Sequence, residues 1–194
     1  MIEYIFLLLL LLYLISKLCY NEYFENKIEE YYITIQNGKY IFNRNNNKLI
    51  ETIDNNLNES IKCITKNIFN NNYDDIILTK SKKNKYTYQI TLKKNDKKRL
   101  LIVERDDYNK YNIYNENNEI YCVVYRSIIN NLESITIRNT DISIKYVTIY
   151  QDSKNSNKYI YKSHFDKNEL FKNEDVLAYA IFVLIKEINL NYYN

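Results

Sequence analysis

The chain has 194 residues, of which 46% are hydrophobic and 26% are charged, and its formal net charge is +3. These values are typical of one globular domain with a sizeable core, and they exclude an intrinsically disordered chain. A net charge this small does not by itself indicate nucleic-acid binding. The sequence has 22 Tyr, no Pro, no Trp and a single glycine, Gly38. Turns must therefore be read from Asn and Asp, whose side chains tolerate left-handed backbone.

The N-terminal segment is strongly hydrophobic. Between Tyr4 and Tyr20 its one charge is Lys17, and this run of roughly 17 residues is at the lower limit for a membrane-spanning helix. No Lys or Arg precedes the run, and no small-residue cleavage site follows it. We therefore predict an uncleaved membrane anchor over residues 1–20 and a linker over residues 21–29. A cleaved signal peptide and a buried soluble helix remain as alternatives.

The charges around this segment bear on its membrane topology. Lys17 and Lys27 both lie on its C-terminal side, which weakly favours a cytoplasmic domain by the positive-inside rule. On that side of the membrane Cys19 would be a candidate for S-acylation. In a luminal domain Asn58, which begins an Asn-Glu-Ser sequon, would be a candidate for N-glycosylation. We expect a single-pass membrane protein and leave the side of the domain open.

Segments rich in Ile, Tyr, Val and Thr that alternate with period 2 follow one another with short polar gaps, and they predict β-strands. The clearest hairpin turn is Asn37-Gly38, because a type I′ turn needs two residues with positive φ. Gaps this short leave no room for crossover helices, so the sheet should be antiparallel. The predicted strands are Glu30–Gln36, Lys39–Asn43, Lys48–Ile53, Ser60–Lys66, Asp74–Lys80, Tyr86–Leu92, Arg99–Glu104, Lys110–Tyr114, Glu119–Arg126, Glu133–Arg138, Asp141–Tyr150 and Lys158–Ser163.

A C-terminal helix decides between a sandwich and a barrel. Asn173 is a suitable N-cap, with Glu174 and Asp175 in the first turn. The stretch Val176–Ile185 is apolar around its whole circumference, yet it is too short to span a bilayer. It must therefore be surrounded by protein, which a closed sheet provides. We predict a mainly β fold over residues 30–194, a closed antiparallel barrel of about twelve strands around a central helix at 174–190.

Two stretches resemble a known family. The acidic-start hydrophobic helix Glu174–Ile188 and the strand-turn-strand segment Tyr111–Arg126 are similar to features of the tubby-like superfamily. That superfamily includes the tubby C-terminal domain, the phospholipid scramblases and the plant LURP-one-related proteins. The resemblance implies a barrel around a helix that binds anionic, phosphoinositide-like phospholipid, with scramblase-like lipid transport as a further option.

Residues that could carry catalysis or bind a metal are scarce. The one histidine, His164, has no second His and no paired Cys at ligand spacing, so we predict no metal site and no cofactor. With no nucleophile elbow and no Gly-rich loop, nothing predicts catalysis, and we expect a protein that is not an enzyme. Cys63 and Cys122 fall in the middle of strands and are expected to be buried free thiols. A disulfide between them is the alternative if the domain is luminal or extracellular.

The basic segment from residue 80 to residue 99 is the strongest functional indication. Its cations face one acid, Asp96, and anionic headgroups attract such clusters by about 1 kcal/mol per cation. The strand Tyr86–Leu92 should separate the cations into two groups, roughly 23 Å apart at ~3.3 Å per residue, so that only one group can face a given membrane patch. The cations are Lys80, Lys82, Lys83, Lys85, Lys93, Lys94, Lys97, Lys98 and Arg99.

We therefore expect a membrane-anchored binding module for anionic phospholipid at a membrane surface, with no nucleic-acid partner. Ordinary solvated loop charge is the alternative interpretation of the basic segment. A different class of function also remains open, in which the chain is an envelope or surface structural protein whose barrel binds a protein partner.

Overall fold

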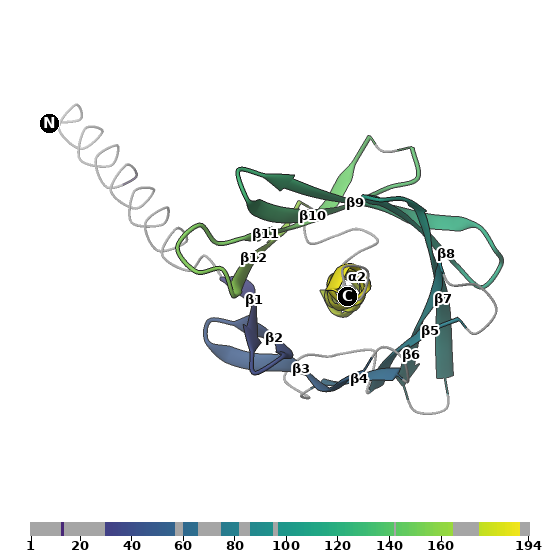
Figure 1. The fold of residues 1–194 in the computed structure, drawn as a ribbon, viewed down its shortest axis with the longest axis horizontal. Helices are drawn as coiled ribbons and strands as arrows, with labels where there is room; N and C mark the ends of the chain where they lie inside the picture. Colours follow the sequence, from purple (N-terminus) through teal and green to yellow (C-terminus); the bar gives the residue numbers. More distant parts are fainter. Residues whose placement is uncertain are drawn as a thin grey trace, which may run out of the picture. The chain divides into compact units, whose positions relative to one another are not determined.

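Twelve strands and one helix make up the ordered core of the described chain, and in this computed structural model the strands close into an antiparallel barrel (Figure 1). The structure describes residues 13, 30–56, 60–65, 75–81, 86–94, 97–141, 143–164 and 175–190. In chain order the elements are β1 (Tyr31–Gln36), β2 (Lys39–Arg44), β3 (Asn47–Asn56), β4 (Ser60–Thr65), β5 (Asp75–Lys80), β6 (Thr87–Lys94), β7 (Lys97–Asp107), β8 (Lys110–Tyr114), β9 (Ile120–Ile129), β10 (Leu132–Arg138), β11 (Lys145–Gln151), β12 (Lys158–Ser163) and α2 (Asp175–Leu190).

Each strand pairs with its neighbours in the chain, and β12 pairs with β1 to close the ring. This up-and-down arrangement leaves no unpaired edge among the described strands, and it confirms the predicted antiparallel barrel. Four predicted strands differ from the observed ones by three residues or more at one end, and β3 and β9 each end three residues later than predicted, at Asn56 and Ile129. Strand β7 is longer than predicted because its pairing with β6 continues into the charged residues as far as Lys94 opposite Lys97. Strand β11 begins only at Lys145, because Asp141 accepts a hydrogen bond from the Ser143 backbone (3.0 Å) in a local turn.

Asparagine supplies the backbone geometry of the tight turns. The predicted Asn37-Gly38 hairpin turn is present, with φ of 51° and 75°. The same positive φ occurs at Asn45 and Asn46 between β2 and β3, and at Asn130 and Asn131 between β9 and β10. Asparagine is one of the few residues other than glycine that adopts this conformation at low cost, which explains how a chain with one glycine builds these hairpins.

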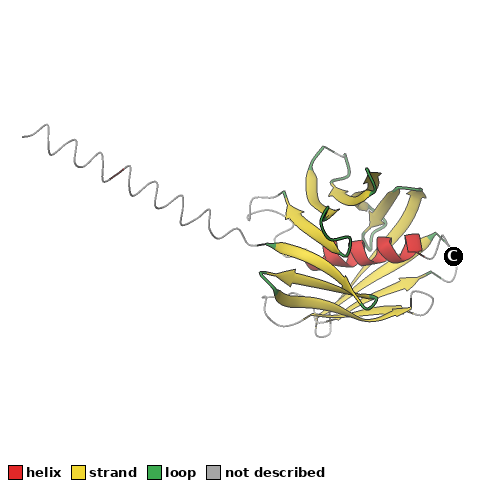
Figure 2. Ribbon diagram, turned by 60° about the vertical axis from the view of Figure 1, so that its left-hand side comes forward, coloured by secondary structure: helices red, strands yellow, loops and turns green. Residues whose placement is uncertain are grey.

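Helix α2 lies inside the barrel (Figure 2). Every residue from Val176 to Ile185 is at most 3% exposed, as expected for a helix with no polar face. The Tyr179 hydroxyl donates to the Tyr40 carbonyl of β2 (2.7 Å), and the ring of Phe182 packs edge-on against Tyr159 of β12. The prediction of a buried central helix is therefore confirmed. Its predicted N-cap, Asn173, and the first predicted helical residue, Glu174, lie outside the described residues.

The position of the first strand distinguishes the two ends of the barrel. The entry end is where β1 begins, and it carries the β2–β3, β6–β7, β8–β9 and β10–β11 connections. The far end carries the β1–β2, β7–β8, β9–β10 and β11–β12 connections. Helix α2 runs from the entry end, where the Tyr161 hydroxyl donates to Asp175, to the far end, where Asn189 donates to the Tyr111 hydroxyl (3.1 Å).

The predicted anchor at 1–20 and the linker at 21–29 lie outside the described residues, apart from Tyr13. Within the part of the chain that the structure describes, no helix combines the length and hydropathy needed to cross a bilayer.

Candidate functional site

The inner face of the barrel changes from apolar to polar toward the far end. In β9 the inward positions run from Val124, fully buried and apolar, to Arg126, and in β10 they run from Ile135 back to Glu133. Because alternate residues of a strand share a face, these charged side chains point at α2 and not into solvent. We call the resulting group the inner polar ring. It comprises Tyr40, Tyr111, Arg126, Glu133 and Tyr159 from the wall and Lys186, Glu187 and Asn189 from α2.

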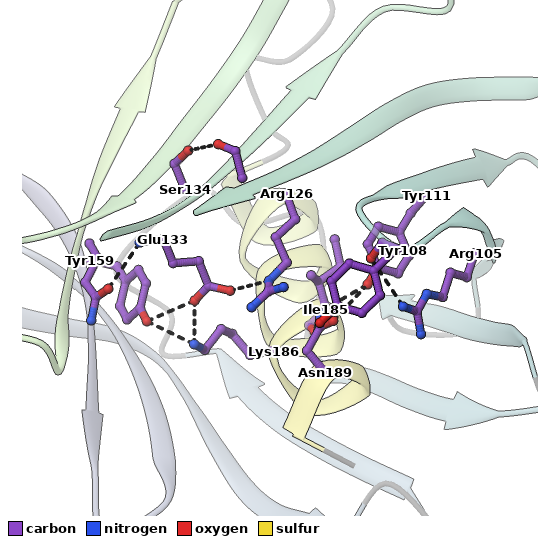
Figure 3. A network of polar contacts seen from close by, with 12 residues as sticks. Arg105, Tyr108, Tyr111, Arg126, Glu133, Ser134, Tyr159, Ile185, Lys186 and Asn189 are labelled. Atoms are coloured by element: carbon purple, nitrogen blue, oxygen red, sulfur yellow. Dashed lines mark hydrogen bonds and ion pairs between the residues drawn. The ribbon is translucent and has the colours of Figure 1, made fainter. Parts of the chain in front are cut away.

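Glu133 stands at the centre of this ring and binds two cations (Figure 3). One carboxylate oxygen accepts from Arg126 Nε (2.5 Å), and the other accepts from Lys186 Nζ (2.5 Å). The Tyr159 hydroxyl donates to the second oxygen (3.1 Å) and itself accepts from Lys186 Nζ (2.9 Å). Arg126 and Glu133 come from neighbouring strands of one hairpin, whereas Lys186 comes from the helix, so the network joins the wall to its core.

The electrostatics keep this network ionised. Burial by itself would raise the pKa of Glu133, but Lys186 and Arg126 outweigh it, and the net pKa of Glu133 lies below its ordinary value. Burial by itself would lower the pKa of Lys186, yet its contact with Glu133 holds that pKa above the usual range. The three side chains therefore carry two positive charges and one negative charge at neutral pH.

A second set of hydrogen bonds completes the ring. The Tyr40 hydroxyl donates to Glu187 Oε1 (2.8 Å), and burial raises the pKa of Glu187 above its ordinary value despite this bond and nearby Lys186. Asn189 Nδ2 donates to the Tyr111 hydroxyl (3.1 Å) and to the Ile185 carbonyl (2.6 Å). Four strands of the wall, β2, β8, β10 and β12, thus hold the last two turns of α2 through polar contacts.

One hydrogen-bond donor of the inner polar ring has no acceptor among the described residues. Arg126 is 9% exposed, and its NH1 nitrogen is buried without a hydrogen-bond partner among the described residues. Nearly all buried donors in proteins are satisfied, and a buried guanidinium donor without an acceptor carries a substantial desolvation cost. An arrangement of this kind suits the binding of an oxyanion.

Of the predicted basic residues that the structure describes, Lys80 lies at one end of the barrel and five others lie at the opposite end. Lys80 ends β5 at the far end, opposite Tyr88. At the other end of β6, the β6–β7 connection brings five cations together at the entry end, where Lys93 pairs with Lys98 and Lys94 with Lys97. We call this second group the basic hairpin, which comprises Lys93, Lys94, Lys97, Lys98 and Arg99. Lys82, Lys83 and Lys85 lie outside the described residues.

The basic hairpin is positive but not wholly uncompensated. Lys97 and Lys98 are exposed, and the Arg99 guanidinium lies 4.9 Å from the ring centroid of Tyr121. Asp75 is the cross-strand partner of Lys93, and Glu116 comes close enough to accept a hydrogen bond from the Leu100 backbone (2.8 Å). Within the described ranges, these two acids neighbour five cations, and the local charge remains positive.

The cysteines of the barrel do not form a disulfide. Cys63 and Cys122 are both buried and are not joined, as in the first of the two predicted states, so the disulfide alternative is not realised. The physical reason is distance, because β4 and β9 stand on opposite sides of α2 (Figure 1), whereas a disulfide needs Cα atoms within about 7 Å. Burial raises the pKa of Cys63 to about 12. Cys19 and Asn58, the candidate modification sites, lie outside the described residues.

His164 directly follows β12, with its Nε2 2.8 Å from the Thr148 hydroxyl. Partial burial, with Lys162 and Lys145 nearby, lowers its pKa. Among the residues that the structure describes, no three His, Cys, Asp or Glu side chains gather closely enough to hold a metal ion.

The fold and the ring define a class: a closed twelve-stranded barrel that encloses an apolar helix and ends in a buried ionic network. Comparison with known proteins returns no matching family model, no similar curated protein and no similar solved structure. The tubby-like resemblance therefore stays a prediction.

The inner polar ring is absent from the sequence-based expectations. Those expectations include strands β9 and β10, but they assign no inward role to the charged ends of these strands and no role to Lys186 and Glu187. The available signal is the alternation itself, because Arg126 and Glu133 continue the inward-facing series of Cys122, Val124 and Ile135. Extending that series by one position predicts two inward charges.

Proposed function

We propose that this chain is a membrane-tethered, non-enzymatic barrel of the tubby-like superfamily that binds anionic phospholipid through its basic hairpin. The observation that carries this proposal is the position of the hairpin. Its five cations lie at the entry end, where β1 begins and where the preceding residues lead back to the predicted anchor. A linker of about ten residues spans at most about 35 Å, so the entry end would remain close to any membrane that holds the anchor.

The energetics are adequate for a tethered module. Cations near an anionic surface each contribute about 1 kcal/mol, and Asp75 and Glu116 offset part of that sum. A few kcal/mol give weak binding to a free domain, but tethering raises the effective lipid concentration and makes weak binding sufficient. Lys80 lies at the far end and is not expected to reach the same membrane patch. The domain side favoured by this proposal is cytoplasmic, where anionic lipids are concentrated.

Vesicle flotation tests the proposal on residues 21–194, which contain the compact unit from residue 31 onward and lack the predicted anchor. We expect co-flotation with vesicles containing phosphatidylserine or phosphoinositide, and not with neutral phosphatidylcholine vesicles, at physiological salt. Equal behaviour with both compositions would overturn the proposal.

A matched pair of charge variants locates the contact. Lys97→Gln combined with Lys98→Gln neutralises two exposed cations of the basic hairpin, and we expect flotation to fall at least tenfold. Lys80→Gln combined with Lys154→Gln removes the same charge from exposed positions at the far end, and we expect flotation to be nearly unchanged. If the two double variants lose binding equally, net charge alone is responsible and the basic hairpin is not the site.

A further inference from the structure

Among the described side chains of the inner polar ring, two cations meet at one carboxylate. Arg126 and Lys186 both bind Glu133, whereas the ring's other carboxyl group, Glu187, accepts a hydrogen bond from the Tyr40 hydroxyl. Buried cations in proteins are normally each matched by an anion. The sharing of one carboxylate by two cations and the unsatisfied NH1 of Arg126 are separate observations, and both favour a further oxyanion beside Arg126.

The residues around Arg126 indicate the chemical class of ligand that would supply the oxyanion. The same β9–β10 hairpin ends in three apolar side chains that are exposed by 38–67%: Ile128, Ile129 and Leu132. Ile128 is the Cα partner of Glu133 and shares the face of the ionic pair, whereas Ile129 and Leu132 pair with each other at the end of the hairpin and alternate to the other face. Exposed apolar side chains beside a buried cation are suited to an amphiphile, which offers an anionic head and an apolar body together.

We propose that the far end of the barrel binds an amphiphile with an oxyanion head, with the guanidinium of Arg126 holding the head and the tip of the β9–β10 hairpin contacting the apolar part. A guanidinium whose Nε is already bound to a carboxylate still presents further N–H donors, and phosphate and carboxylate oxygens are the acceptors that it binds best. Lys186 adds a second positive charge next to Glu133. This site is independent of the basic hairpin, which lies at the entry end.

The test uses the full chain in a non-ionic detergent with two probes, dihexanoyl phosphatidic acid below its micelle concentration and inorganic phosphate. Binding is followed by thermal unfolding and by ³¹P NMR titration, with chloride at matched ionic strength as the reference. We expect the amphiphile to bind at least tenfold more tightly than inorganic phosphate. Binding of the amphiphile no tighter than that of phosphate, or no stabilisation by either probe beyond chloride, would overturn the proposal.

Arg126→Lys is the decisive variant because it keeps the charge opposite Glu133 but removes the extra donors. We expect at least a tenfold loss of amphiphile affinity. Arg138→Lys makes the same chemical change at the entry end of β10 and is expected to bind like the wild type. Equal affinity of the Arg126 and Arg138 variants would contradict the assignment.

Two further measurements keep the test decisive. If Arg126→Lys does not fold, as judged by circular dichroism, the side-chain N–H signals of Arg126 in the wild type report directly. They should shift on addition of the amphiphile, and their failure to shift would overturn the proposal. The double variant Lys97→Gln, Lys98→Gln should retain amphiphile binding, so failure of the flotation experiment and failure of this one are distinguishable.

Discussion

The two ends of the barrel interior bury a carboxylate in opposite ways. At the entry end Asp175 meets the Tyr161 hydroxyl, and burial raises its pKa above the ordinary value although Arg44 acts against this. At the far end Glu133 is also enclosed, but Lys186 and Arg126 lower its pKa despite burial. The direction of the shift is decided by whether the contacts with cations outweigh burial, as the two bound cations do for Glu133 and the single nearby Arg44 does not for Asp175.

The two ends of the barrel interior are also filled by different kinds of side chain. Around the start of α2 the interior is filled by packed rings, with Phe42 stacked on Tyr179 and edge-on to Tyr161. Around its last turns the interior is filled by an ionic network in which one donor has no acceptor within the described chain. Packed aromatic rings offer a ligand no unsatisfied polar group, whereas the ionic network offers the unsatisfied NH1 of Arg126. The far end is therefore the more suitable place for a ligand inside the barrel.

The largest expected effect comes from neutralising each carboxylate in turn. Glu133→Gln leaves two buried cations without a counter-charge, and we expect the free energy of unfolding to fall by about 3–5 kcal/mol. Asp175→Asn removes a carboxylate whose charged form is disfavoured by burial, and we expect a loss below about 1 kcal/mol. Urea denaturation of both variants at pH 7 measures the difference. Equal losses of unfolding free energy in the two variants would contradict the different roles of cations at the two ends.

The core between the two ends should exclude reagents. With its pKa raised to about 12, Cys63 has a thiolate fraction roughly three orders of magnitude below that of an ordinary thiol, and burial blocks access as well. In a Cys19→Ser background we expect neither Cys63 nor Cys122 to react with iodoacetamide until the protein unfolds. Mass spectrometry across a urea series checks this, and labelling of either thiol below the unfolding transition would show an open interior.

The turns offer a comparison of backbone and side-chain contributions. Asn131 in the far-end turn and Asn46 in the entry-end turn have similar φ values of 61° and 67°, so Ala at either position should cost about 1–2 kcal/mol of stability. Asn46 also accepts a hydrogen bond from the Tyr32 hydroxyl (2.6 Å), which adds about 1 kcal/mol to its loss. The corresponding Gly variants isolate that increment: Asn131→Gly should be nearly neutral, and Asn46→Gly should lose the hydrogen bond alone. Thermal unfolding of the four variants measures these differences.

The smallest effect is in the pH dependence of stability. Because the folded pKa of Asp175 is raised, its protonation favours the folded state, and its contribution to stability grows as pH falls from 7 toward the ordinary value of 3.8. Glu133 has a lowered folded pKa, so its contribution is present above 4.5 and is lost only as pH falls further. Asp175→Asn should therefore flatten the stability profile on the side above pH 3.8, by no more than about 1.4 kcal/mol per unit of pKa shift.

Glu133→Gln should leave the mildly acidic part of the profile unchanged and remove the loss below pH 4.5. Chemical denaturation across pH 3.5–7 compares the two variants with the wild type. A steeper profile for Asp175→Asn above pH 5 would contradict the expected sign.

The amino-acid sequence by itself determined the strands, the antiparallel pairing and the enclosure of the helix. Period-2 alternation and short gaps leave few other topologies, and the all-apolar surface of Val176–Ile185 has to be covered on every side. Strand ends were less accurate, as at β7 and β11, because pairing and local side-chain turns set them and hydrophobicity does not. The Asn37-Gly38 turn was predictable because positive φ is a local property of those two residues.

Only the tertiary structure decided the chemistry of the interior. Arg126, Glu133 and Lys186 are separated by up to 60 positions in the chain, and each one alone resembles an ordinary surface charge. They meet because the barrel closes and because α2 has the length and direction to bring its last turns to the far end. The up-and-down order of the strands places the basic hairpin at the end where β1 begins. Long-range register and helix direction are collective properties of the closed sheet, so no local pattern in the sequence reports them.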